Sequence, residues 1–175
     1  VPNDSLYAAY LALKTAGEGL NLKIFGARAV ESMRMEKGFL HWKADLITEF
    51  DPFETGLDRF VKMDKPDFIG KTALEKRVAA GPTAKLATLK IDTDKAPAYG
   101  GGSLMADIDG SKQVVGTITS GDWGHRVGMN LAYAFMKPGY WDLGTETQLD
   151  LCGQLVNATV IEPCPYDPAF EIIRG

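Results

Sequence analysis

Arg34 has the chemistry and the position of a ligand-binding side chain. The spacing of apolar residues predicts a helix over 27–37 that ends at Gly38, and Arg34 lies at the edge of its apolar face. A guanidinium group fixed there would present a fork of donors to a carboxylate or to an electron-rich heterocycle. The alternative is an i,i+3 ion pair with Glu31, which contributes only tenths of a kcal/mol when it is exposed. The apolar face itself is predicted to consist of Ala27, Val30 and Met33.

Three aromatic side chains follow this helix closely: Phe39, His41 and Trp42. Trp42 could form a stacking wall for a flat ligand, although aromatic residues in such a position more often belong to a core. His41 has no second histidine or cysteine nearby, because the only other histidine of the chain is His125. The two cysteines are too few for a four-ligand site, and we therefore expect no metal site.

Glu54 closes the motif Asp51-Pro52-Phe53-Glu54, which has the form of a helix start. Asp51 would be the N-cap, Pro52 the first helical residue, and Glu54 would accept a hydrogen bond from the cap amide. This capping role explains the carboxylate without any ligand. The alternative is a carboxylate that accepts paired N–H donors from the guanidine-like edge of an amino-heterocycle.

The composition excludes several classes of partner. The 175 residues carry a formal net charge of −4, with 45% hydrophobic and 24% charged residues. An acidic chain without a basic stripe is a poor partner for nucleic acid, and no apolar run is long enough to span a membrane. We therefore expect a protein of the cytoplasm or, in a eukaryote, of the mitochondrial matrix.

Hydrophobic periodicity predicts the α+β class and divides the chain into two parts. The period is helical before the Gly81-Pro82 pair and changes to two from Ala84 onward. We therefore place a domain boundary there. Residues 1–82 form a helical and α/β part, and residues 83–175 form a β domain.

The first part is predicted to contain two further helices, over 3–16 and 69–80, and a short strand over 60–63. Gly17 would end the first of these helices. The residues of that helix that are predicted to face a core are Leu6, Tyr10 and Leu13.

The second part is predicted to be a six-stranded antiparallel β-barrel, with a sandwich as the alternative. Apolar and polar residues alternate over 87–92, and Asp109-Gly110 is a strong hairpin turn. Further strands are expected near 115–119, 129–135, 147–151 and 155–161. A length of roughly 85 residues suits one small β domain.

The motifs of several enzyme classes are absent from the sequence. There is no GxSxG elbow, HExxH helix or CxxC pair, and Gly100-Gly101-Gly102 lacks the Lys-Ser/Thr of a phosphate-binding loop. We therefore assign no catalytic residue. The residues alone indicate a possible pocket near Arg34, Trp42 and Glu54, and they name no reaction.

Several blocks of sequence are similar to one known family. In the first part they are FGARA (25–29), SMRMEKG (32–38), DPFETGL (51–57) and FIGKTAL (68–74), and in the second VGTITSG (115–121) and LAY (131–133). In this order the blocks resemble the folate-binding T-protein, or aminomethyltransferase, family. GHRVG (124–128) and PYDP (165–168) resemble the branch in which this module forms the C-terminal part of flavin-dependent dimethylglycine and sarcosine dehydrogenases.

The resemblance implies a tetrahydrofolate pocket. The parent protein would transfer a one-carbon unit to tetrahydrofolate from an amine of the glycine, sarcosine or dimethylglycine type, and any FAD would be bound by a fused upstream domain. Its partners would be folate, the methylated amine and the upstream half of the same polypeptide. Matched to the family's motifs, Arg34 and Glu54 become candidate folate contacts, and Trp42 a candidate stacking residue.

Two departures from the family pattern predict a C-terminal fragment with an incomplete site. The family's N-terminal Asp and its Gly-Glu-x-Gly-x-Glu segment are not in this sequence. We therefore expect weak folate binding and no turnover from this chain alone. The alternatives are a non-catalytic folate-binding or interaction module and a folate-dependent demethylase variant. The iron–sulfur maintenance branch fits less well, because its Lys-Gly-Cys-Tyr signature is replaced here by Lys37-Gly38-Phe39-Leu40.

Overall fold

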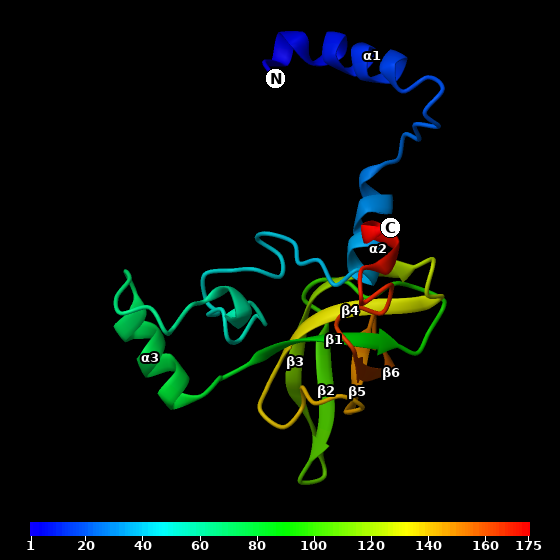
Figure 1. The fold of residues 1–175 in the computed structure, drawn as a ribbon. Coiled ribbons are helices and arrows are strands. Elements are labelled where there is room, and N and C mark those ends of the chain that lie inside the picture. Colours follow the sequence, from blue (N-terminus) through cyan, green and yellow to red (C-terminus); the bar gives the residue numbers. More distant parts are fainter. The chain divides into compact units, whose positions relative to one another are not determined.

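The computed structural model describes residues 1–175, except for the side chain of Ile173. Contacts divide the chain into two compact units, Val1–Val30 and Glu31–Gly175. The second unit contains the closed β-barrel of Figure 1 and the segment that precedes it. The predicted α+β class is therefore confirmed, whereas the domain boundary after residue 82 stays a prediction.

The first unit is helical. A 3₁₀ helix, Asn3–Ser5, continues into helix α1, Leu6–Ala16, which ends at Gly17 as predicted. The predicted core face of α1 is wrong, because its three residues are all exposed: Leu6, Tyr10 and Leu13. A helical period shows which side chains share a face, but it does not show what covers that face.

Helix α2, Ala27–Glu36, buries a different face from the one that its apolar residues predict. Val30 and Met33 are 44% and 46% exposed. The buried residues are Ser32, Met35 and Glu36. The predicted apolar face is therefore wrong.

Hydrogen bonds explain the face that α2 buries. The Ser32 hydroxyl donates to the carbonyl oxygen of Trp123 at 2.6 Å, and the Glu36 carboxylate accepts the N–H of Val127 at 3.1 Å. Both partners belong to the barrel side of the unit, at the end of strand β3 (Ser111–Gly124) and just beyond it. Buried polar groups need such partners, and these two hydrogen bonds fix the helix together with Met35, which packs against Leu131 and Tyr133.

Between α2 and the barrel, the chain forms the 3₁₀ helix η2, Asp58–Phe60, and helix α3, Lys71–Ala80. Helix α3 confirms the prediction for 69–80. The predicted strand over 60–63 is wrong, because η2 extends to Phe60 and residues 61–63 form no strand. The six strands of the barrel pair with one another in a closed order, and residues 60–63 pair with none of them.

The barrel confirms the predicted six-stranded architecture. Its strands are β1 Lys85–Ile91, β2 Ser103–Ile108, β3 Ser111–Gly124, β4 Met129–Met136, β5 Glu146–Leu151 and β6 Gln154–Ile161. They pair antiparallel in the closed order β1-β4-β3-β2-β5-β6 (Figure 1). Asp109 and Gly110, with φ of 51° and 76°, form the predicted hairpin turn between β2 and β3.

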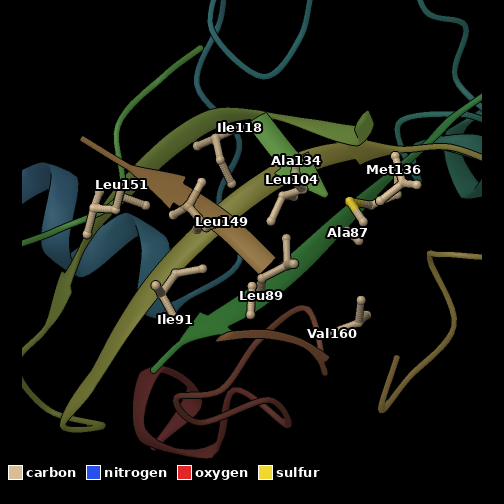
Figure 2. Packing of buried hydrophobic residues seen from close by; sticks show 14 residues of the cluster. Ala87, Leu89, Ile91, Leu104, Ile118, Ala134, Met136, Leu149, Leu151 and Val160 are labelled. Carbon is tan, nitrogen blue, oxygen red and sulfur yellow. The ribbon is translucent and has the colours of Figure 1, made fainter. Parts of the chain in front are cut away.

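The barrel interior is the main hydrophobic core. Figure 2 shows Leu89, Leu104 and Leu149, from three different strands, with their side chains gathered among the strands. Each of the three is fully buried. Alternation of side chains along each strand brings them to one face, as the period of two predicts.

Strand β3 contains a β-bulge at Thr119. Ile118 pairs with Ala134 and Ser120 pairs with Tyr133, so Thr119 is the extra residue of the strand. A bulge interrupts the alternation of side chains, and successive residues can then share one side of the strand. The hydroxyl groups of Thr119 and Ser120 consequently reach the same carboxylate oxygen, Oδ1 of Asp45.

The C-terminal segment packs over the end of α2. The Nζ atom of the buried Lys37 is 2.8 Å from Oδ2 of Asp167 and 3.9 Å from the centroid of the Phe170 ring. Gly38 follows with φ of 72°, and a Cβ atom on it would lie 2.7 Å from the carbonyl oxygen of Pro163. The segment after β6 therefore leaves no room for a side chain at position 38.

We predict that Gly38→Ala destabilises the protein by about 3 kcal/mol, because strain at positive φ adds to the clash with Pro163. Gly139→Ala is the matched control: Gly139 has φ of 88°, and nothing lies within 4 Å of a Cβ atom built on it. The Gly139→Ala variant should lose only about 1–2 kcal/mol of folding stability, which is the strain of a positive φ alone. Denaturant unfolding measures both losses, and equal losses would contradict the steric role of Gly38.

We predict that Asp167→Asn reduces stability at neutral pH and has little effect in acid. Hydrogen bonding from Lys37 lowers the pKa of Asp167 in the folded protein. A lowered folded pKa contributes stability above the unfolded pKa, and this contribution is lost as the pH falls through the folded value. Melting temperatures between pH 7 and pH 2 should therefore converge for the variant and the wild type. Asp107→Asn, which breaks an exposed pair with Lys112, should change little at any pH.

Candidate functional site

Arg34 makes the ion pair predicted with Glu31 and also a second one, with the buried Asp45. Its Nη2 atom is 2.7 Å from Oε2 of Glu31, and its Nη1 atom is 2.7 Å from Oδ2 of Asp45. Nη1 also donates to the carbonyl oxygen of Phe39 at 3.2 Å. The Arg34 side chain is 10% exposed and that of Glu31 is 35% exposed. One edge of the guanidinium group is therefore fixed by buried groups, and another edge is fixed by a partly solvated carboxylate.

The carboxylate of Asp45 has no solvent-exposed surface, and four donors satisfy it. Oδ2 accepts the Nη1 of Arg34 at 2.7 Å and the backbone N–H of His41 at 2.8 Å. Oδ1 accepts the hydroxyl groups of Thr119 and Ser120. A buried charge requires such a partner set, so Asp45 joins the turn after α2 to strand β3.

Tyr133, which belongs to strand β4, lies next to Arg34. Its hydroxyl donates to the carbonyl oxygen of Met35 at 3.0 Å, and the Arg34 Cζ atom is 5.5 Å from the centroid of its ring. Burial raises the pKa of the Tyr133 phenol well above its ordinary value. Tyr133 is therefore a neutral hydrogen-bond donor, and its ring face lies within cation–π range of the guanidinium.

Glu54 confirms the predicted capping motif, although the chain there makes a turn and not a helix. Its Oε2 accepts the N–H of Asp51 at 3.1 Å and the Nη2 of Arg77 at 3.3 Å. Its Oε1 accepts both the hydroxyl and the N–H of Thr83, at 2.7 and 3.0 Å, and the N–H of Ala84. Burial alone would raise the pKa of Glu54, but these hydrogen bonds outweigh it and lower the pKa. Oε1 therefore holds the start of the barrel against the turn, whereas Oε2 caps the turn and binds α3 through Arg77.

Trp42 and Phe39 are on the surface, 67% and 52% exposed. The interpretation of these two aromatic residues as core is therefore wrong. The turn that carries Trp42 is held by an isolated bridge to Leu46 and by the bond from His41 to Asp45. Hydrogen bonds of the backbone fix this turn, and the ring of Phe39 stacks on that of Phe170, with 6.4 Å between the ring centroids.

A cavity of about 590 Å³ lies beside these residues. Its lining is Gly38, Phe39, Leu40, Leu46, Thr55, Gly56, Leu57, Arg59, Leu86, Ala87, Thr88, Tyr133 and Pro163. Arg34, Trp42 and Glu54 do not line it themselves. Arg34 adjoins it through Phe39 and Tyr133, and Glu54 adjoins it through Thr55. Arg34 and Glu54 therefore both lie behind residues that line the same cavity.

The sequence reasoning missed three residues of this site: Asp45, Arg59 and Tyr133. Asp45 stands in a polar loop and has no motif of its own, and Tyr133 looks like an ordinary strand residue. Arg59 is the one charged side chain in the lining of the cavity. The sequence did contain one indication of Tyr133, because this residue belongs to the LAY block (131–133), which resembles the sequences of the family.

Neither a candidate metal cluster nor a membrane-spanning helix occurs in the described part of the chain. No cluster of three or more His, Cys, Asp or Glu side chains there could hold a metal ion. No helix of that part has the length and apolar character needed to cross a bilayer.

Comparisons with known proteins agree on one family. The glycine cleavage T-protein C-terminal barrel domain matches residues 85–167, and the GCVT N-terminal domain matches residues 1–65. The solved structure of glycine cleavage system aminomethyltransferase T from Bartonella henselae superposes with a TM-score of 0.78 at 25% identity. This match covers 92% of this chain and 44% of that one.

Two human enzymes are similar in sequence. Mitochondrial dimethylglycine dehydrogenase is 33% identical over 156 residues, which are 89% of this chain and 18% of that protein. Mitochondrial sarcosine dehydrogenase is 34% identical over 183 aligned residues, which cover 100% of this chain and 19% of that protein. The chain thus spans less than a fifth of the length of these relatives.

The closed barrel and the helical segment before it together define a domain pair of the aminomethyltransferase type. The chain belongs to the glycine cleavage T-protein family. This confirms the resemblance predicted from the sequence blocks, including the similarity to dimethylglycine and sarcosine dehydrogenases.

We predict that Glu54→Gln lowers the free energy of unfolding by about 2 kcal/mol at pH 7. The NH₂ group of glutamine cannot accept a hydrogen bond, so it would leave the donors of Thr83 or the N–H of Asp51 without an acceptor. The cost should shrink in acid, since the folded pKa of Glu54 is lowered and its contribution is lost as the pH falls through that pKa. Denaturant unfolding of the variant and the wild type at pH 7 and pH 3 measures the loss of stability at each pH. Glu75→Gln, at a half-exposed carboxylate of α3, should stay within about 0.5 kcal/mol of wild type.

Proposed function

We propose that this chain forms the C-terminal part of a tetrahydrofolate-dependent one-carbon transferase. The observation that carries the proposal is the match of both T-protein domains, in order, to a chain whose Arg34 adjoins a ligand-sized cavity. The donor of the one-carbon unit would be an amine of the glycine, sarcosine or dimethylglycine type. The names of the relatives support this class of substrate.

The residues of the cavity suit a folate. Folates combine a flat heterocycle, an aromatic ring and terminal carboxylates, and ligand cavities of roughly 300–1,000 Å³ are typical for molecules of drug size. Phe39, Leu57 and Leu86 supply apolar walls, and the Arg59 guanidinium supplies a charge for a carboxylate. The cavity of about 590 Å³ therefore has the volume and the mixture of groups that such a ligand requires.

Tetrahydrofolate, when bound, would supply the nitrogen atoms that accept the one-carbon unit. Arg34 would orient the ligand with a guanidinium that Asp45 already holds. Tyr133 and the apolar lining would keep water from the face that they cover. Trp42 would stack on the ligand from the surface turn, and Glu54 would contact the folate or fix the wall that does.

The remaining parts of the active site would come from an upstream portion of the same polypeptide. The chain spans only 18% of dimethylglycine dehydrogenase, so most of such a protein lies outside the matched region. Any FAD would be bound there. A location in the mitochondrial matrix would follow from the same likeness, because both human relatives are named as mitochondrial.

Calorimetric titration of tetrahydrofolate into the full-length polypeptide and into this chain tests the proposal. We expect binding to the full-length protein, much weaker binding to this chain, and a loss of about tenfold to a hundredfold in Arg34→Ala. Trp42→Ala should weaken binding to a smaller extent, and Lys112→Ala, at an exposed pair on β3, should leave it unchanged.

Other results would overturn parts of the proposal. A full-length protein that does not bind tetrahydrofolate would exclude the folate function. Equal and tight binding by both proteins would exclude a site completed from upstream. If Arg34→Ala or Glu54→Gln lowers the melting temperature and leaves the affinity unchanged, that residue belongs to the scaffold alone.

A further inference from the structure

The two carboxylates that hold Arg34 differ in their surroundings. Asp45 has no exposed surface and four hydrogen-bond donors, and its pair with Arg34 is 2.7 Å long. Glu31 is 35% exposed and pairs with the other edge of the fork at 2.7 Å. An arriving ligand can exchange with a solvated carboxylate, but it cannot displace a carboxylate that is buried among its own donors.

The bulge at Thr119 gives the two carboxylate oxygens of Asp45 different hydrogen-bond partners. In a regular strand, successive side chains point to opposite faces, so only one of Thr119 and Ser120 would reach a given carboxylate. The register shift lets both hydroxyl groups donate to Oδ1 of Asp45. Oδ2 is thereby left to the Arg34 fork and to the N–H of His41.

We propose that Asp45 is the positioning residue for Arg34 and that Glu31 occupies the ligand edge of the guanidinium when no ligand is bound. This proposal rests on the proposed function, because it takes Arg34 as a contact of the folate or of the amine substrate. The proposal predicts that removing Asp45 and removing Glu31 have opposite effects on ligand affinity. Loss of Asp45 releases the guanidinium and weakens binding, whereas loss of Glu31 removes a competitor and strengthens it.

The test is calorimetric titration of tetrahydrofolate into the full-length polypeptide with single substitutions. Asp45→Asn keeps the size of the side chain and removes its charge, and we expect a loss of affinity on the order of tenfold, because the ligand must then order a guanidinium group that Asp45 no longer holds. Glu31→Gln should raise the affinity. Glu36→Gln is the matched control for a buried carboxylate, because Glu36 accepts backbone N–H groups of Arg126 and Val127 and has no contact with Arg34.

A smaller change covers the case in which Asp45→Asn does not fold. Ser120→Ala removes one donor to Oδ1 of Asp45 and leaves the others in place. It should weaken binding in the same direction by a smaller factor. In an Arg34→Ala background neither Ser120→Ala nor Glu31→Gln should change the affinity, since each acts through Arg34.

The outcomes separate this inference from the function on which it rests. A wild-type protein without affinity for tetrahydrofolate overturns both. A wild-type protein that binds, with Asp45→Asn or Ser120→Ala unchanged or with Glu31→Gln weaker, overturns only the roles assigned to Asp45 and Glu31. Equal loss of affinity in Glu36→Gln and Asp45→Asn would show a general effect of destabilisation, and it would overturn the positioning role as well.

Discussion

The buried carboxylate of Asp45 connects the parts of the molecule that form the cavity. It accepts hydrogen bonds from the end of α2, from the turn after it and from strand β3. Removing one partner of a buried ion pair typically costs about 3–5 kcal/mol, because the other charge is then left unpaired. The contact between Arg34 and Asp45 is consequently a structural joint between α2 and the barrel, and it also fixes the guanidinium group that we propose as a ligand contact.

The closed barrel supplies the rigidity on which this joint depends. The six strands pair in a closed order, and the segment before β1 attaches to the start of that strand through Glu54, whose carbonyl oxygen accepts the N–H of Leu86 at 2.8 Å. Glu54 attaches that segment at the start of β1, and Lys37 attaches the C-terminal segment to the end of α2. Polar contacts thus place these two segments around a barrel whose core is apolar.

The cavity takes its character from this arrangement. One wall is the barrel surface at Leu86 and Tyr133, and the other walls are the turns around Phe39 and Leu57. Loops held by a rigid scaffold commonly carry binding residues, and this cavity lies between such loops and the barrel. The same geometry explains why Glu54 has a strong structural role even while it stands next to the cavity.

The sequence by itself determined the α+β class, the barrel, the hairpin at Asp109-Gly110, the capping motif of Glu54 and the family. These features follow from local periodicity, turn chemistry and short motifs, which act over a few residues. The tertiary structure alone decided the buried face of α2, the loss of the predicted strand over 60–63 and the pairing of Arg34 with Asp45. Each of these depends on groups far apart in the chain, and Thr119 and Ser120 meet Asp45 only because a register shift turns both hydroxyl groups to one side.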